Sequence, residues 1–120
     1  MVSDTLNALH DQFAGCHTLA FADLSTQMVL VTNTPSTTTR EHLDALCAEA
    51  ASAFGPAGLP ALGTHPASTV IIATPDHVRL YLRDPQEPAD ALCCVCDHTV
   101  VVGDFLEKAR ICLEQICRAA

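Results

Sequence analysis

The spacing of apolar residues switches repeatedly along the chain between the period of a helix and the period of a strand. Helical spacing occurs in three segments, which run from Ser3 or Asp4 to Gly15, from Thr39 to Phe54, and from Val100 or Gly103 to Arg118. Five segments are typical of strands: Cys16–Leu24, Met28–Thr32, Thr69–Ala73, His77–Arg83 and Ala91–Cys96. The order α-β-β-α-β-β-β-α predicts a single α+β domain over residues 1–120, with helices packed on a five-stranded antiparallel sheet.

Local signals mark both ends of the middle helix. Thr38 stands three residues before Glu41, which is the spacing of a capping box. Gly55 and Pro56 favour the end of the helix. The segment 55–67 contains three glycines and three prolines, so we expect an irregular loop there.

The composition of the chain limits which partners it is expected to bind and where in the cell it is expected to be found. Of the 120 residues, 49% are hydrophobic and 17% are charged, which excludes intrinsic disorder. The formal charge of −8 repels phosphate backbones and anionic lipids, so we expect neither nucleic acid nor a membrane as a partner. The chain has no apolar run long enough to cross a bilayer and no basic-then-apolar start, and this predicts a cytoplasmic protein. Its seven cysteines are then expected to be thiols.

The third and fourth strand segments have different apolar patterns. Thr69–Ala73 is apolar without alternation, so we expect both of its faces to be covered. His77–Arg83 alternates, with valine and leucine facing inward. The outward set is a candidate contact for a partner, because tyrosine and arginine favour interface centres: Arg79, Tyr81 and Arg83.

The third strand segment also suggests a need for a partner chain. At the edge of a sheet, Val70–Ile72 would leave backbone groups unpaired and apolar side chains exposed. A second copy of the chain is the simplest way to cover them. The candidate dimer interface combines this strand with the apolar stripe of the middle helix: Leu43, Leu46, Cys47, Ala50, Phe54, Val70, Ile71 and Ile72.

Cysteines and histidines offer few catalytic arrangements. Cys94, Cys96 and His98 would share one strand face, but at about 3.3 Å per residue a straight strand cannot gather all three around zinc. We therefore predict buried thiols, no metal and no cofactor, and keep Cys94 and Cys96 as the alternative of a metal-binding sensor. Adjacent Cys16 and His17 point to opposite faces, and the sequence contains no phosphate-binding loop motif, so we expect no enzyme activity.

The order of elements and several local patterns resemble the roadblock / dynein light chain family. The similar stretches cover nearly the whole chain: Gly15–Asp23, Met28–Leu30, Leu43–Phe54, Val70–Ile72, Val78–Tyr81, and Leu92–Cys96 with the helix that follows it. The resemblance implies a profilin-like fold. It also implies a dimer in which Thr69–Ala73 pairs with its mate and Thr39–Phe54 packs across the seam.

The resemblance also implies a function. Bacterial proteins of this type commonly act on small Ras-like GTPases as activators or scaffolds, and eukaryotic ones serve as dynein or signalling adaptors. The loop 55–67 and the cysteine-rich strand Ala91–Cys96 depart from the commonest pattern. The leading hypothesis is a non-enzymatic, homodimeric regulator or scaffold for a small GTPase. The alternative is a small ligand- or metal-binding sensor that uses the cysteines of the fifth strand.

Overall fold

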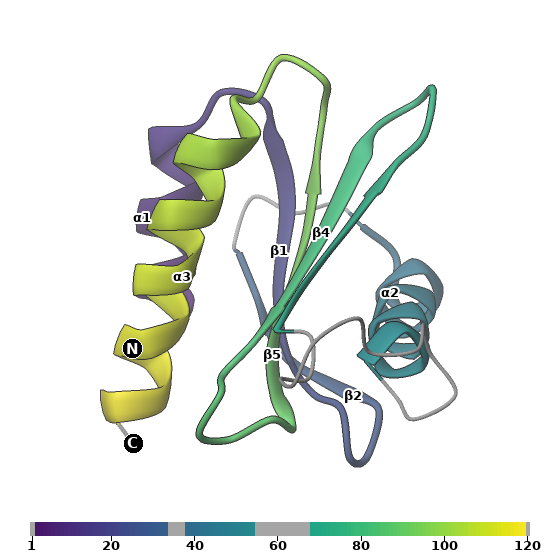
Figure 1. Ribbon diagram of the computed structural model, residues 1–120, viewed down its shortest axis with the longest axis vertical. Helices are drawn as coiled ribbons and strands as arrows, with labels where there is room; N and C mark the ends of the chain where they lie inside the picture. Colours follow the sequence, from purple (N-terminus) through teal and green to yellow (C-terminus); the bar gives the residue numbers. More distant parts are fainter. Residues whose placement is uncertain (1, 34–37, 55–67, 120) are drawn as a thin grey trace.

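A computed structural model describes residues 2–33, 38–54 and 68–119. Its elements follow the predicted order: α1 (Val2–Gln12), β1 (Cys16–Asp23), β2 (Met28–Thr32), α2 (Arg40–Phe54), β3 (Thr69–Ala73), β4 (Val78–Arg83), β5 (Asp90–Cys96) and α3 (Val102–Ala119). Helices α1 and α3 lie on one face of the sheet and α2 lies on the other (Figure 1). The expected loop 55–67 falls outside the described residues.

The strands form one antiparallel sheet in the order β2-β1-β5-β4-β3. Strand β5 is at the centre, and most of its side chains, Cys93 and Cys94 among them, are buried because helices cover both faces. Strands β2 and β3 are the two edges. The predicted antiparallel sheet and its two hairpins are confirmed.

Each face of the sheet has its own apolar core. Leu19, Leu80 and Leu92 face α1 and α3, and there they pack with Phe105 and other apolar residues of those helices. On the opposite face, Ala20 and other small side chains of β1 leave room for α2 to approach closely. Alternation along the strands therefore assigns neighbouring residues to different cores.

Helix ends differ from the expected positions by a few residues. Helix α1 begins at Val2, before the expected caps, and ends at Gln12. Helix α2 is capped by Thr39, whose Oγ1 accepts a hydrogen bond from the His42 backbone N–H at 3.3 Å, so the predicted capping box on Thr38 is wrong. The Thr38 hydroxyl lies 2.6 Å from the Thr18 hydroxyl of β1 instead.

Two buried polar side chains tie loops to the sheet. The Asn33 side-chain oxygen accepts a hydrogen bond from the Leu19 N–H at 2.9 Å and extends the pairing between β1 and the end of β2. Asp84 is 1% exposed, and both of its oxygens accept hydrogen bonds from Arg118, at 2.7 and 3.2 Å. This two-point contact fixes the end of α3 against the turn after β4.

Gly15 precedes β1 at a point where two turns approach closely. Its carbonyl accepts a hydrogen bond from the Asp97 N–H at 2.8 Å. A Cβ at this position would lie 2.5 Å from Asp97 Oδ1 and 2.7 Å from Val100 Cγ2, so the turn after β5 would have to move. A Cβ at Gly103, by contrast, would meet no atom within 4 Å.

We expect Gly15→Ala to lower the free energy of unfolding by about 1–3 kcal/mol, because the Asp97 turn must shift. Gly103→Ala is the matched control. Its added methyl group meets nothing, and alanine raises helix propensity, so stability should stay the same or rise by about 0.5 kcal/mol. Urea unfolding of both variants measures the difference, and equal midpoints would contradict the close approach at Gly15.

Candidate functional site

Among the described residues, strand β3 has a hydrogen-bonded neighbour, β4, on one side of its backbone only. Ser68 O accepts a hydrogen bond from Arg83 N at 3.0 Å, and Thr74 N donates to His77 O at 2.9 Å. In an antiparallel ladder the residues that bond to the partner strand alternate with residues that point away from it. The even-numbered positions of β3 therefore bond to β4, and the others direct their N–H and C=O groups to the free edge: Thr69, Ile71 and Ala73.

The side chains of β3 are only partly covered. Val70 and Ile72 are half-buried and pack towards α2. Ile71 is on the other face, lies opposite Leu80 in the pairing with β4, and is 46% exposed. The expectation that both faces of this strand are covered is therefore wrong within the single chain: α2 partly covers the face of Val70 and Ile72, but the Ile71 face is only half covered.

The apolar stripe of α2 lies against the sheet of its own chain. Its five residues are 0–9% exposed: Leu43, Leu46, Cys47, Ala50 and Phe54. They pack with Ala20, Ala22 and Tyr81 in the second core. The stripe predicted to contribute to a dimer interface is thus used within the chain, and among the predicted interface residues Ile71 is the most exposed.

The outward face of β4 is largely covered by α2. Tyr81 is fully buried, so the prediction that it faces solvent is wrong. The Arg79 side chain is 20% exposed and bound to Glu49. The Arg83 guanidinium lies 4.7 Å from the centre of the Phe54 ring at the end of α2. Arg79, Tyr81 and Arg83 therefore all contact α2 of their own chain.

Glu49 joins α2 to β4 through a small polar network. Arg79 Nε donates to Glu49 Oε1 at 2.7 Å, Arg79 Nη2 donates to Oε2 at 3.1 Å, and the Tyr81 hydroxyl also donates to Oε1. Burial by itself raises the pKa of Glu49, but these hydrogen bonds outweigh it and place the pKa below its ordinary value. Burial and the Glu49 carboxylate raise the pKa of Tyr81, which keeps its proton on the hydroxyl. The network therefore holds a carboxylate ionised beside the core.

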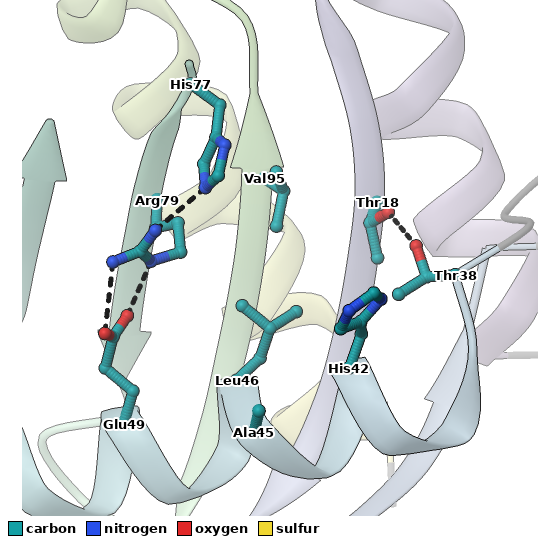
Figure 2. A pocket seen from close by; sticks show the side chains of 9 residues that line it. All are labelled: Thr18, Thr38, His42, Ala45, Leu46, Glu49, His77, Arg79 and Val95. Carbon is teal, nitrogen blue, oxygen red and sulfur yellow. Dashed lines mark hydrogen bonds and ion pairs between the residues drawn. The ribbon is translucent and has the colours of Figure 1, made fainter. Parts of the chain in front are cut away.

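A cavity of about 390 Å³ lies beside this network, between α2 and the sheet (Figure 2). Its polar lining residues are near two ends, with Glu49, His77 and Arg79 at one and Thr18, Thr38 and His42 at the other. The lining between the two ends is apolar: Ala45, Leu46 and Val95. His77 Nε2 lies 2.8 Å from Arg79 Nη1 and must accept this hydrogen bond, because a guanidinium only donates.

The cysteines of β5 are packed inside the two cores. Cys94 and Cys96 face α1 and α3, whereas Cys93 faces α2 and His98 is exposed after the strand. Burial raises the pKa of Cys93 to about 12, and it also raises the pKa of Cys94 well above its ordinary value. Both shifts oppose the thiolate needed for metal binding or nucleophilic attack. In the part of the chain that the structure describes, no three His, Cys, Asp or Glu side chains are grouped to hold a metal ion. The geometry thus gives no support to the metal-sensor alternative.

Comparison with known proteins identifies the fold as that of the Roadblock/LC7 domain. No protein-family model and no curated protein matches the sequence. Two solved structures of a Roadblock/LC7 domain from Streptomyces avermitilis align with TM-scores of 0.70 and 0.73, at 13% and 9% identity. These alignments cover 96% and 98% of this chain, and 97% and 95% of the other chains. Myxococcus xanthus MglB aligns with a TM-score of 0.76 at 10% identity, over 98% of this chain and 93% of that one.

These likenesses extend over nearly the whole chain and confirm the predicted roadblock-like fold. At such low identity they establish the arrangement of helices and strands, and they leave the partner open. Within residues 2–33, 38–54 and 68–119, no helix combines the length and hydropathy that a membrane-spanning segment needs.

Sequence reasoning missed the Glu49 network and the cavity. A signal was present, because Glu49 is three residues after Leu46, and this spacing places it beside the buried stripe. The lone tyrosine of the chain, Tyr81, is two residues from Arg79 on the strand that the stripe covers. The pairing of the two elements could not be read from the sequence, since it depends on how α2 crosses the sheet.

We expect Glu49→Gln to lower the free energy of unfolding at neutral pH by about 1–2 kcal/mol, because charged hydrogen bonds from Arg79 and Tyr81 are weakened. The pKa of Glu49 is lowered in the folded state, so its contribution is fully present above the ordinary carboxyl pKa. It is lost as the pH falls through the folded-state value. The stability difference between wild type and variant should therefore shrink in acid.

Urea unfolding between pH 7 and pH 3 measures this difference. Glu107→Gln, an exposed change on α3, is the control and should alter stability by less than about 0.5 kcal/mol. A Glu49→Gln effect that is absent at neutral pH, or that grows in acid, would refute the role assigned to the carboxylate.

Proposed function

We propose that this chain is a non-enzymatic regulatory or scaffold protein that works as a homodimer and binds a small Ras-like GTPase. The observation that carries the proposal is the free β3 edge, where outward backbone groups coincide with the exposed Ile71. The roadblock-like fold and the family resemblance of the sequence give the expectation of a GTPase partner.

Strand β3 lacks the features that usually protect an edge from pairing. Its residues, Thr69–Ala73, include no charge and no proline, and they pair with β4 without a register shift. The other edge strand, β2, pairs with β1 through an irregularity next to Phe21 and Ala22, and such bulges twist an edge away from a regular partner. Of the two edges, β3 is therefore the better template for a second copy.

The geometry of β3 suits a two-fold arrangement. Ile71 is the middle residue of the strand, and its outward N–H and C=O groups can pair with those of Ile71 in a second copy. Thr69 of each chain would then lie opposite Ala73 of the other. Such pairing would join two sheets into one and would cover the half-exposed Ile71 side chains.

We expect wild-type protein at micromolar concentration to have twice the 12.7 kDa mass of one chain, and Ile71→Lys to reduce the mass to that of a monomer. Two lysines at the seam would face each other, and like charges directly opposite are unfavourable. Leu30→Lys on β2 is the matched control, because Leu30 is 52% exposed and should leave the dimer intact. Light scattering coupled to size-exclusion chromatography gives the masses.

A second variant separates loss of pairing from loss of folding. Ile71→Pro removes only an N–H that points away from β4, and proline is tolerated at this side of an edge strand. It should give a folded monomer. A wild-type monomer, or a dimer that persists in both Ile71 variants, would contradict the proposed seam.

The GTPase partner is tested by binding measurements with the small Ras-like GTPases of the source organism, loaded with GDP or with a non-hydrolysable GTP analogue. We expect at least one of them to bind the wild-type dimer, with a preference for one nucleotide state. Ile71→Lys should weaken the binding by about tenfold or more, because a monomer presents half of the joined surface. Leu30→Lys should bind like wild type, and failure of every GTPase to bind would refute this part of the proposal.

A further inference from the structure

We propose that the cavity beside α2 is a binding site for a small, uncharged organic molecule that carries a carbonyl or amide oxygen. This site is separate from the proposed dimer seam. Its described lining comes from β1, β4, β5 and α2, together with Thr38 and His77, and no residue of β3 contributes to it.

The size and the apolar lining of the cavity suit a small molecule. Its volume of about 390 Å³ lies in the range of known ligand pockets. Leu46 of α2 and Val95 of β5 give it an apolar middle, on which a flat ring can rest (Figure 2). Ala45, an exposed residue of α2, also lines the cavity.

At the Arg79 end of the cavity, hydrogen-bond donors that remain unused outnumber the unused acceptors. The Arg79 guanidinium has five N–H groups, of which three make the contacts with Glu49 and His77 described above. Since His77 accepts through Nε2, its proton is on Nδ1, which gives the ring a donor. Both Glu49 oxygens already accept hydrogen bonds from Arg79. A ligand is therefore best recognised through its own acceptor oxygen.

The charge balance of the cavity selects a neutral ligand. The positive charge of Arg79 is matched by the ionised Glu49, whose two oxygens lie 2.7 and 3.1 Å from guanidinium nitrogens. Among the residues that the structure describes, the lining contains no second arginine and no lysine. The whole chain carries a formal charge of −8, which repels anions. A carbonyl or amide oxygen can accept from Arg79 or His77 without adding a charge, whereas a carboxylate or phosphate would add a negative charge beside a guanidinium that Glu49 already matches.

Benzamide is a suitable probe, because it combines a ring with an uncharged amide, and benzoate is its charged counterpart of similar shape. We expect benzamide to cause saturable shifts of the Ala45, Arg79 and Val95 amide signals in ¹H–¹⁵N NMR spectra at millimolar concentration. Benzoate should bind about tenfold more weakly. Absence of saturable shifts with benzamide would overturn the site, and benzoate binding as tight as benzamide binding would overturn the neutral-ligand assignment.

A matched pair of variants tests whether the shifts come from the cavity. Ala45→Trp places a large ring at the cavity lining, and Ala48→Trp places the same ring at an exposed position of α2 that does not line it. We expect Ala45→Trp to abolish benzamide binding and Ala48→Trp to preserve it. Ala45→Phe gives a second, smaller obstruction with the same expected loss. Benzamide shifts that persist in both Ala45 variants would overturn the proposal.

The same titration can be made with Ile71→Lys, which lies outside the cavity. Benzamide should bind this variant as it binds wild type, whatever the mass of the protein. Loss of benzamide binding in Ile71→Lys would contradict the independence of the cavity from the β3 edge. A wild-type monomer that still binds benzamide would refute the proposed seam and leave the ligand site standing.

Discussion

Helices can cover both faces of a sheet, but only hydrogen bonding can satisfy the backbone groups at its edges. In this chain α1 and α3 cover one face and α2 covers the other, so the apolar surface of the inner strands is buried. The arrangement leaves β2 and β3 as edges. Neither edge strand carries a charge, and β3 is the one that pairs with its neighbour without a register shift. The account of function depends on what pairs with the outward groups of β3.

Helix α2 limits how such pairing can occur. Its apolar stripe is held against its own sheet, and Glu49 binds Arg79 and Tyr81 of β4 at the same interface. If α2 left its own sheet to pack its apolar stripe on another chain, the sheet face beneath it would be exposed, and Arg79 would lose its contact with the Glu49 carboxylate. The helix therefore stays with its own chain, and in the proposed dimer a second copy would meet the strand edge.

The sequence predicted the order and type of the elements because their apolar periods are distinct. The switch from alternation in β1 to helical spacing in α2 is visible in the residues themselves. Faces were harder to assign: the alternation of β4 correctly separates Leu80 from Tyr81, but polarity alone suggested that Tyr81 faces solvent. That face is buried because α2 crosses it, and Glu49 satisfies the hydroxyl. Ile71 is partly exposed because β3 is at the edge of the sheet, and the residues of β3 alone do not predict that position.

Amide hydrogen exchange along β3 tests the central claim most directly. The N–H groups of Val70 and Ile72 bond to β4 in any state, whereas those of Thr69, Ile71 and Ala73 point to the free edge. The account predicts that the Ile71 amide becomes protected as protein concentration rises, until it exchanges as slowly as its neighbours. Fast exchange of the Ile71 amide at every concentration, with Val70 and Ile72 protected throughout, would show an edge that stays unpaired and would contradict the account.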